Sequence, residues 1–200
     1  LMLARDLVGR HTEFSNETWG LDAVAGRFIE ISGGSGTAVL TACARLLVQA
    51  QRRGALTAWI GGNTCSFFPP DFAAAGIDLA ALPVVTVNDV KAACHVADTL
   101  LRSGAFGVIA LNLGERSRLA FAVQTRLAGL AKKHHTALLL LTRRGPSEDT
   151  GGSLVSLRAD TQKRRTAHDC FLCEISIRKD KRRVAGWNHA EMCSGTPGLC

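Results

Sequence analysis

The sequence predicts an α/β domain, in which a mostly parallel sheet is flanked by helices and followed by a β-rich C-terminal end. Two observations lead to this fold class. Short apolar runs alternate with helical segments of about a dozen residues along most of the chain, as in parallel sheets covered on both faces. Strand-like segments near the C-terminus instead follow one another through short turns. Since 200 residues suit one domain, we expect an N-terminal arm over residues 1–25 and a single core over residues 26–200.

Strands and helices of the core are expected to alternate from residue 27 onward. Bulky apolar residues that alternate or run on without a break predict strands over residues 27–32, 56–60, 82–87, 108–113 and 136–141. Apolar residues at helical spacing predict helices over residues 39–51, 71–76, about 90–103 and 116–133. Asn88 or Asp89 can cap the third of these helices, and Gly104 can end it.

The β-rich end is expected after a loop of Pro, Ser, Asp and Gly over residues 145–152. Strands are predicted over residues 154–157, 170–177 and 184–190. Residues 179–183 would form a charged turn between the last two strands.

A glycine-rich loop joins the first strand to its helix. It consists of Gly33, Gly34, Ser35, Gly36, Thr37 and Ala38. A phosphate-binding loop of the form Gly-x-x-x-x-Gly-Lys-[Ser/Thr] needs a lysine for the phosphate charge and a hydroxyl for Mg²⁺. Thr37 and Ala38 stand at these two positions, so the loop is expected to be a degenerate nucleotide loop. A plain glycine turn between strand and helix would look the same.

The seven cysteines are an odd number and are scattered, which predicts reduced thiols rather than a disulfide scaffold. His168, Cys170, Cys173 and Cys193 could supply zinc ligands. However, Cys170 and Cys173 lie three apart in an expected strand and would point to opposite faces, so we expect neither a metal nor another cofactor. No apolar run is long enough to cross a bilayer and no signal-peptide pattern is found, so we expect a cytoplasmic protein without a membrane partner.

The order of these features resembles the RecA recombinase core over roughly residues 20–190. The resemblance is carried by the strand, loop and helix at 27–51, the segments 54–60, 76–79 and 97–105, and the strand at 108–112. In RecA-like ATPases, an Asp that orders Mg²⁺ ends the last of these strands, and a Glu that activates water follows the strand at 56–60. Asn112 and Asn63 stand at these positions. The resemblance therefore implies a pseudo-ATPase that is not an enzyme.

A RecA-like core with this chemistry removed looks like the ImuA/SulA-like family of DNA-damage-inducible proteins, and its length and basic C-terminal end favour the ImuA branch. Such a resemblance implies a role in SOS-induced translesion synthesis and mutagenesis, with RecA, ImuB and an error-prone polymerase subunit as partners. A short apolar helix around residues 3–8 resembles the position where RecA protomers join. Leu3 and Leu7 are therefore expected to mediate docking onto RecA or self-association. Two alternatives stay open: a SulA-type division inhibitor that binds FtsZ, and a weak ATPase or nucleotide-binding switch.

The net charge of +7 is concentrated toward the C-terminus. The candidate DNA-binding or partner-binding residues are Arg143, Arg144, Arg158, Lys163, Arg164, Arg165, Lys179, Lys181, Arg182 and Arg183. A basic surface attracts phosphates, but base stacking needs aromatic side chains. Trp187 is the only aromatic residue near the last of these groups, and the chain has no Tyr. DNA, an acidic protein partner and a solvated basic surface are therefore all compatible with the sequence.

Overall fold

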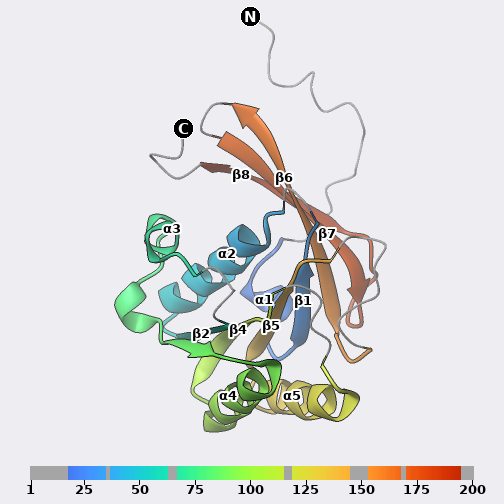
Figure 1. Cartoon of the computed structure of the whole chain (residues 1–200). Coiled ribbons are helices and arrows are strands. Elements are labelled where there is room, and N and C mark those ends of the chain that lie inside the picture. The colour runs from blue at the N-terminus through green and yellow to red at the C-terminus, as the bar shows by residue number, and fades with distance from the viewer. Residues whose placement is uncertain are drawn as a thin grey trace, which may run out of the picture.

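The computed structural model describes residues 18–34, 37–62, 67–114, 119–144, 153–167 and 170–194. These residues form an eight-stranded sheet with helices on both faces (Figure 1). The strands are β1 (Phe28–Ser32), β2 (Leu56–Gly62), β3 (Val84–Val87), β4 (Phe106–Asn112), β5 (Ala137–Thr142), β6 (Leu157–Ala167), β7 (Cys170–Asp180) and β8 (Asn188–Ser194). The helices are α1 (Leu21–Val24), α2 (Val39–Arg52), α3 (Pro69–Ala74), the 3₁₀ turn η1 (Leu79–Ala81), α4 (Val90–Ser103) and α5 (Phe121–Lys133).

The strand order is β3-β2-β4-β5-β1-β6-β7-β8. The six strands from β3 to β6 pair in parallel, whereas β7 and β8 add antiparallel strands at one end. β1 lies between β5 and β6, so the strand before the glycine loop is central to the sheet. The predicted α/β class, with its parallel sheet and β-rich C-terminal end, is confirmed.

Several boundaries follow directly from the local sequence. Asp89 caps α4, because its Oδ1 accepts a hydrogen bond of 2.7 Å from the backbone N–H of Ala92. Gly104 ends α4 with a φ of 67°, a conformation that glycine adopts without strain. The next helix was predicted to start at residue 116, which lies outside the described residues; in the described part, Ala120 has extended backbone angles and α5 begins at Phe121.

The predictions for the C-terminal end were wrong in detail. The expected strand at 154–157 is instead the approach to β6, which continues to Ala167 through a largely charged stretch. β7 extends to Asp180, and the last strand begins at Asn188 rather than at residue 184. β6 was missed because two of its charged residues, Arg158 and Asp160, are buried and the residues from 162 to 166 are exposed, so its sequence lacks the apolar pattern of a buried strand.

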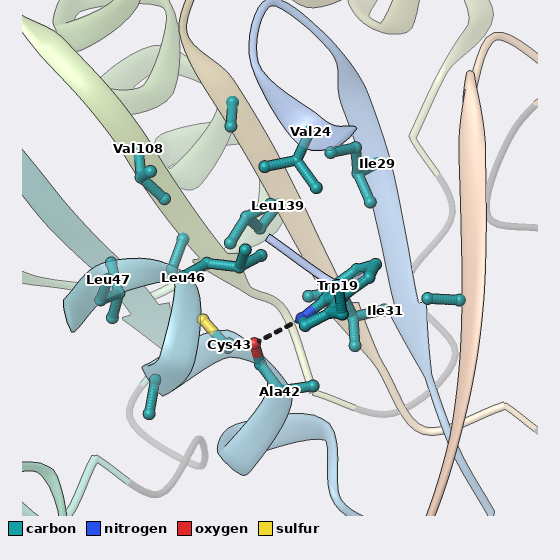
Figure 2. Packing of buried hydrophobic residues seen from close by; sticks show 14 of the residues in the cluster. Trp19, Val24, Ile29, Ile31, Ala42, Cys43, Leu46, Leu47, Val108 and Leu139 are labelled. Carbon is teal, nitrogen blue, oxygen red and sulfur yellow. Dashed lines mark hydrogen bonds between the residues drawn. The ribbon is translucent and has the colours of Figure 1, made fainter. Parts of the chain in front are cut away.

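Two apolar layers hold the helices against the sheet. Figure 2 shows the layer on the α2 side, where Trp19 packs beside α2 and donates its indole N–H to the Ala42 carbonyl at 3.0 Å. The antiparallel strand β7 adds Ile175 and Ile177 to this layer, so α2 is buried on most sides. The opposite layer packs α4 and α5 through residues such as Leu101 and Leu127. In the described part of the chain, none of the helices has the length and apolar character to cross a membrane.

Candidate functional site at the end of strand β1

The glycine loop lies at the C-terminal end of β1, between Ser32 and the first residue of α2, Val39. The structure describes Gly33, Gly34, Thr37 and Ala38, whereas Ser35 and Gly36 lie outside the described residues. This position, between a central parallel strand and the N-terminus of a helix, is the usual place for a phosphate loop.

Thr37 stands at the lysine position of the phosphate-loop pattern, and its side chain is hydrogen-bonded within the protein. Its hydroxyl lies 3.0 Å from the hydroxyl of Thr161 on β6, and it accepts a hydrogen bond of 3.2 Å from the backbone N–H of Val39. A Cβ atom at Gly33 would lie only 2.1 Å from the Thr37 hydroxyl, so only glycine fits there. The first N–H group of α2 is therefore bonded to the protein's own side chain, and the loop is attached to β6.

A buried polar cluster lies beside the loop on the α5 side of the sheet. The side chain of Glu30 is fully buried in the middle of β1. Thr142 donates a hydrogen bond of 3.1 Å to its carboxylate, and Arg144 Nε lies 3.7 Å from it. Arg158 is the residue paired with Glu30 on β6, and it is also buried. Arginine side chains therefore balance the charge of a carboxylate that has no access to water.

The same cluster continues to the end of β1. Ser32 donates a hydrogen bond of 2.6 Å to Asp160, its neighbour on β6. Arg178 donates a second hydrogen bond of 2.9 Å to the other oxygen of Asp160, and Arg158 Nε lies 3.5 Å from this carboxylate. Both carboxylates of the cluster are thus engaged by groups of the protein, and the arrangement is that of a structural ion-pair network.

The predicted basic residues fall into separate places. Arg144 and Arg158 are buried in the polar cluster. Lys179 and Lys181 both place Nζ 3.2 Å from the carbonyl oxygen of Ser153, while Arg182 donates to the carbonyl oxygens of Ala25 and Gly26 at 3.0 and 3.1 Å. Burial and, next, repulsion by Lys181 lower the pKa of Lys179. These three side chains connect the end of β7 and the turn after it to the backbone of Ser153, Ala25 and Gly26 by hydrogen bonds.

The other basic candidates are exposed. Lys163, Arg164 and Arg165 are consecutive on the part of β6 that extends past the parallel strands, so the side chain of Arg164 points to the opposite face from the other two. Arg143 and Arg183 are exposed elsewhere. Lys163 lies over the ring of Phe171 at 4.0 Å, and Arg164 pairs with Glu174 at 2.9 Å. The structure therefore does not bring the ten candidates together on one surface.

Asn112 ends β4, as expected, and its side-chain oxygen accepts a hydrogen bond of 3.3 Å from the backbone N–H of Gly114. Asn63, Leu3, Leu7 and His168 lie outside the described residues. Among the residues that the structure describes, no three His, Cys, Asp or Glu side chains are placed to hold a metal ion.

Sequence reasoning did not identify Glu30, Ser32 or Asp160. One signal was available for Glu30, because a carboxylate between Ile29 and Ile31 in a predicted buried strand requires a partner. The residues around Glu30 in the sequence do not indicate that this partner comes from β6 or from the end of β5.

Comparisons with known proteins agree with this architecture. No protein-family model matches the chain. The chain is 24% identical over 196 aligned residues to the protein RecA of Fusobacterium nucleatum, a match that covers 80% of this chain and 51% of that protein. The chain thus spans about half the length of the curated relative it matches. The match supports a RecA-like family, and the mostly parallel sheet flanked by helices is a RecA-like fold.

Proposed function

We propose that this protein is a non-catalytic, RecA-related accessory protein of the DNA-damage response. The observation that carries the proposal is the position of Thr37, whose hydroxyl contacts Thr161 and the N-terminus of α2 where an ATPase would hold nucleotide phosphates. The relatedness to RecA supports a role associated with DNA damage.

The loss of catalysis follows from the chemistry of phosphoryl transfer. That reaction depends almost entirely on positioned cations and polar groups around the phosphates. The loop has Thr37 and Ala38 in place of the lysine and the Mg²⁺-binding hydroxyl, and Asn112 and Asn63 stand in place of the two carboxylates. We infer a pseudo-ATPase with degenerate nucleotide-binding motifs and no bound cofactor.

We further propose that the protein is closest to the ImuA branch of the ImuA/SulA-like family and acts in the cytoplasm in SOS-induced translesion synthesis and mutagenesis. Its partners would be RecA, or ImuB and an error-prone polymerase subunit. Leu3 and Leu7 would mediate docking onto RecA or self-association. An apolar edge of the sheet is compatible with protein docking, because β3 is an edge strand and the nearby side chains of Phe68, Leu79 and Val84 are exposed.

The proposal can be tested with purified proteins. Calorimetric titration with ATP, with and without Mg²⁺, should give no binding and no hydrolysis, since the loop is closed by Thr37. In parallel, immobilised RecA should retain the protein, and the double substitution Leu3→Asp and Leu7→Asp should abolish retention. Asp at the exposed and unrelated Leu56 is the matched control and should leave retention unchanged.

Other outcomes would favour the alternatives. Mg²⁺-dependent ATP binding would indicate a nucleotide switch. Binding to FtsZ, without binding to RecA or ImuB, would indicate a division inhibitor of the SulA type.

Direct contact with DNA is a second candidate activity, favoured by the exposed Lys163, Arg164 and Arg165 on β6. Phosphate contacts release counterions, so the affinity for a labelled single strand should fall steeply as salt is added. Substituting all three residues by Gln should remove that dependence, and an unchanged salt dependence would exclude this part of β6.

A further inference from the structure

An open cavity of about 580 Å³ lies between α1, α2 and the turn after β7, and none of its lining residues belongs to the glycine loop. Arg45, Arg53 and Arg183 line it, and Asp22 is the one acidic residue among the described residues of the lining. Arginines thus outnumber carboxylates among the described lining residues.

The floor of the cavity is the polar stripe of α2. Arg45, Gln49 and Arg53 follow one another at intervals of four residues, so their side chains lie in a row on one side of the helix. Most other residues of α2 are buried. The two arginines are separated by two helical turns, or about 12 Å. Gln49 accepts a hydrogen bond of 3.0 Å from the backbone N–H of Leu21 and so holds the start of α1 against α2.

Two arginines of the cavity, Arg45 and Arg53, bind carboxylates of the protein itself. Arg53 donates two parallel hydrogen bonds of 2.7 and 3.1 Å to Asp22, and these lower the pKa of that carboxyl group. Arg45 pairs with Glu191 on β8, while its buried Nε has no hydrogen-bond partner among the described residues. The side chain of Asp22 is 82% exposed, so its pairing with Arg53 is weak and a carboxylate from a partner can replace it.

We infer that this cavity binds an extended acidic peptide segment of a partner protein. An extended chain rises about 3.3 Å per residue, so acidic side chains four residues apart would match the spacing of Arg45 and Arg53. A single phosphate could not reach both arginines. A nucleic-acid strand fits less well, because the aromatic residue of the lining, Trp19, is fully buried and offers no face for base stacking. The inference does not depend on the state of the glycine loop.

A fluorescent peptide of about ten residues, with Glu at every fourth position, tests this inference in the full chain at about 0.15 M ionic strength. The control peptide carries Gln instead of Glu. Arg53→Gln should weaken binding of the acidic peptide about three- to tenfold, because a bidentate contact is lost. Arg52→Gln removes the same charge one residue away, at an exposed position outside the cavity lining, and should change affinity less than twofold.

A gain of affinity provides the complementary test. Asp22→Asn should strengthen peptide binding about two- to fivefold, since it frees Arg53, whereas Asp71→Asn on α3 removes another exposed charge outside the lining and should have little effect. Equal losses in Arg52→Gln and Arg53→Gln would overturn the inference in favour of non-specific attraction. Tighter binding of an oligothymidine than of the acidic peptide, with loss in Arg53→Gln, would overturn it in favour of nucleic acid.

Discussion

At the scale of single residues, Arg27, directly before β1, and Asp180, at the end of β7, form a buried ion pair. Their side chains are 2% and 1% exposed and lie 2.6 Å apart. Arg27 also donates to the carbonyl oxygens of Ala23 and Ser156. Burial alone would raise the pKa of Asp180, but the hydrogen bond from Arg27 and those from the backbone of the following turn outweigh burial and lower this pKa. The ionised carboxylate is therefore the form that the fold stabilises.

Asp180→Asn should lower the free energy of unfolding by about 3 kcal/mol at pH 7, because Arg27 is left charged and buried without its partner. Since the folded-state pKa lies below the ordinary value of 3.8, the stabilisation is fully present above that value and is lost as the pH falls through the folded pKa. The difference between wild type and variant, measured by urea unfolding, should therefore shrink below about pH 4. Equal stability of the two proteins at pH 7 would contradict this account.

At the scale of elements, α2 is enclosed between the parallel strands and the antiparallel end of the sheet. Leu46 is fully buried, whereas Leu40, at the start of the same helix, is 41% exposed. The helix is therefore held by packing on several sides rather than by one amphipathic face.

Leu46→Ala should cost about 3 to 4 kcal/mol in the free energy of unfolding, because it removes buried contacts and leaves a cavity. Leu40→Ala makes the same chemical change in the same helix and should cost less than about 1 kcal/mol. Equilibrium unfolding of both variants gives the comparison. Similar costs would show that the two positions are equally enclosed.

At the scale of the whole molecule, the centre of the sheet is assembled from distant parts of the chain. β1 pairs with β5 and β6, and Phe28 faces Leu138 in the register of the first pair. Among the described strands, β2 is next to β1 in sequence but does not pair with it in the sheet. Such non-local pairing makes folding slow. The central strand can pair only when both distant segments of the chain are present.

A chain truncated after His135 keeps β1 to β4 but loses both neighbours of β1. We expect it to show no cooperative unfolding transition in circular dichroism, while the full chain shows one. A cooperative transition in the truncated chain would mean that the N-terminal elements fold independently.

The sequence was sufficient to predict what depends on local pattern. The parallel strands β1 to β5, the cap at Asp89 and the end of α4 at Gly104 follow from periodicity and turn chemistry, and the glycine loop could be found from its composition. The contact between Thr37 and Thr161 could not be predicted, because the two residues lie 124 positions apart in the sequence. The buried charges of β6 were missed for the same reason, since only the folded sheet shows what neutralises them.

The pairing of Glu30 with Arg158 also selects one alignment of β1 and β6. Sliding β6 by one residue would turn Arg158 toward the apolar α2 side and would place Ala159 opposite Glu30. A misaligned β6 would thus bury the charge of Arg158 in apolar surroundings and remove it from the side of the sheet on which Glu30 lies. Misplacing an aliphatic side chain would not carry this cost. In related sequences, these two positions should consequently change together, either both charged or both apolar.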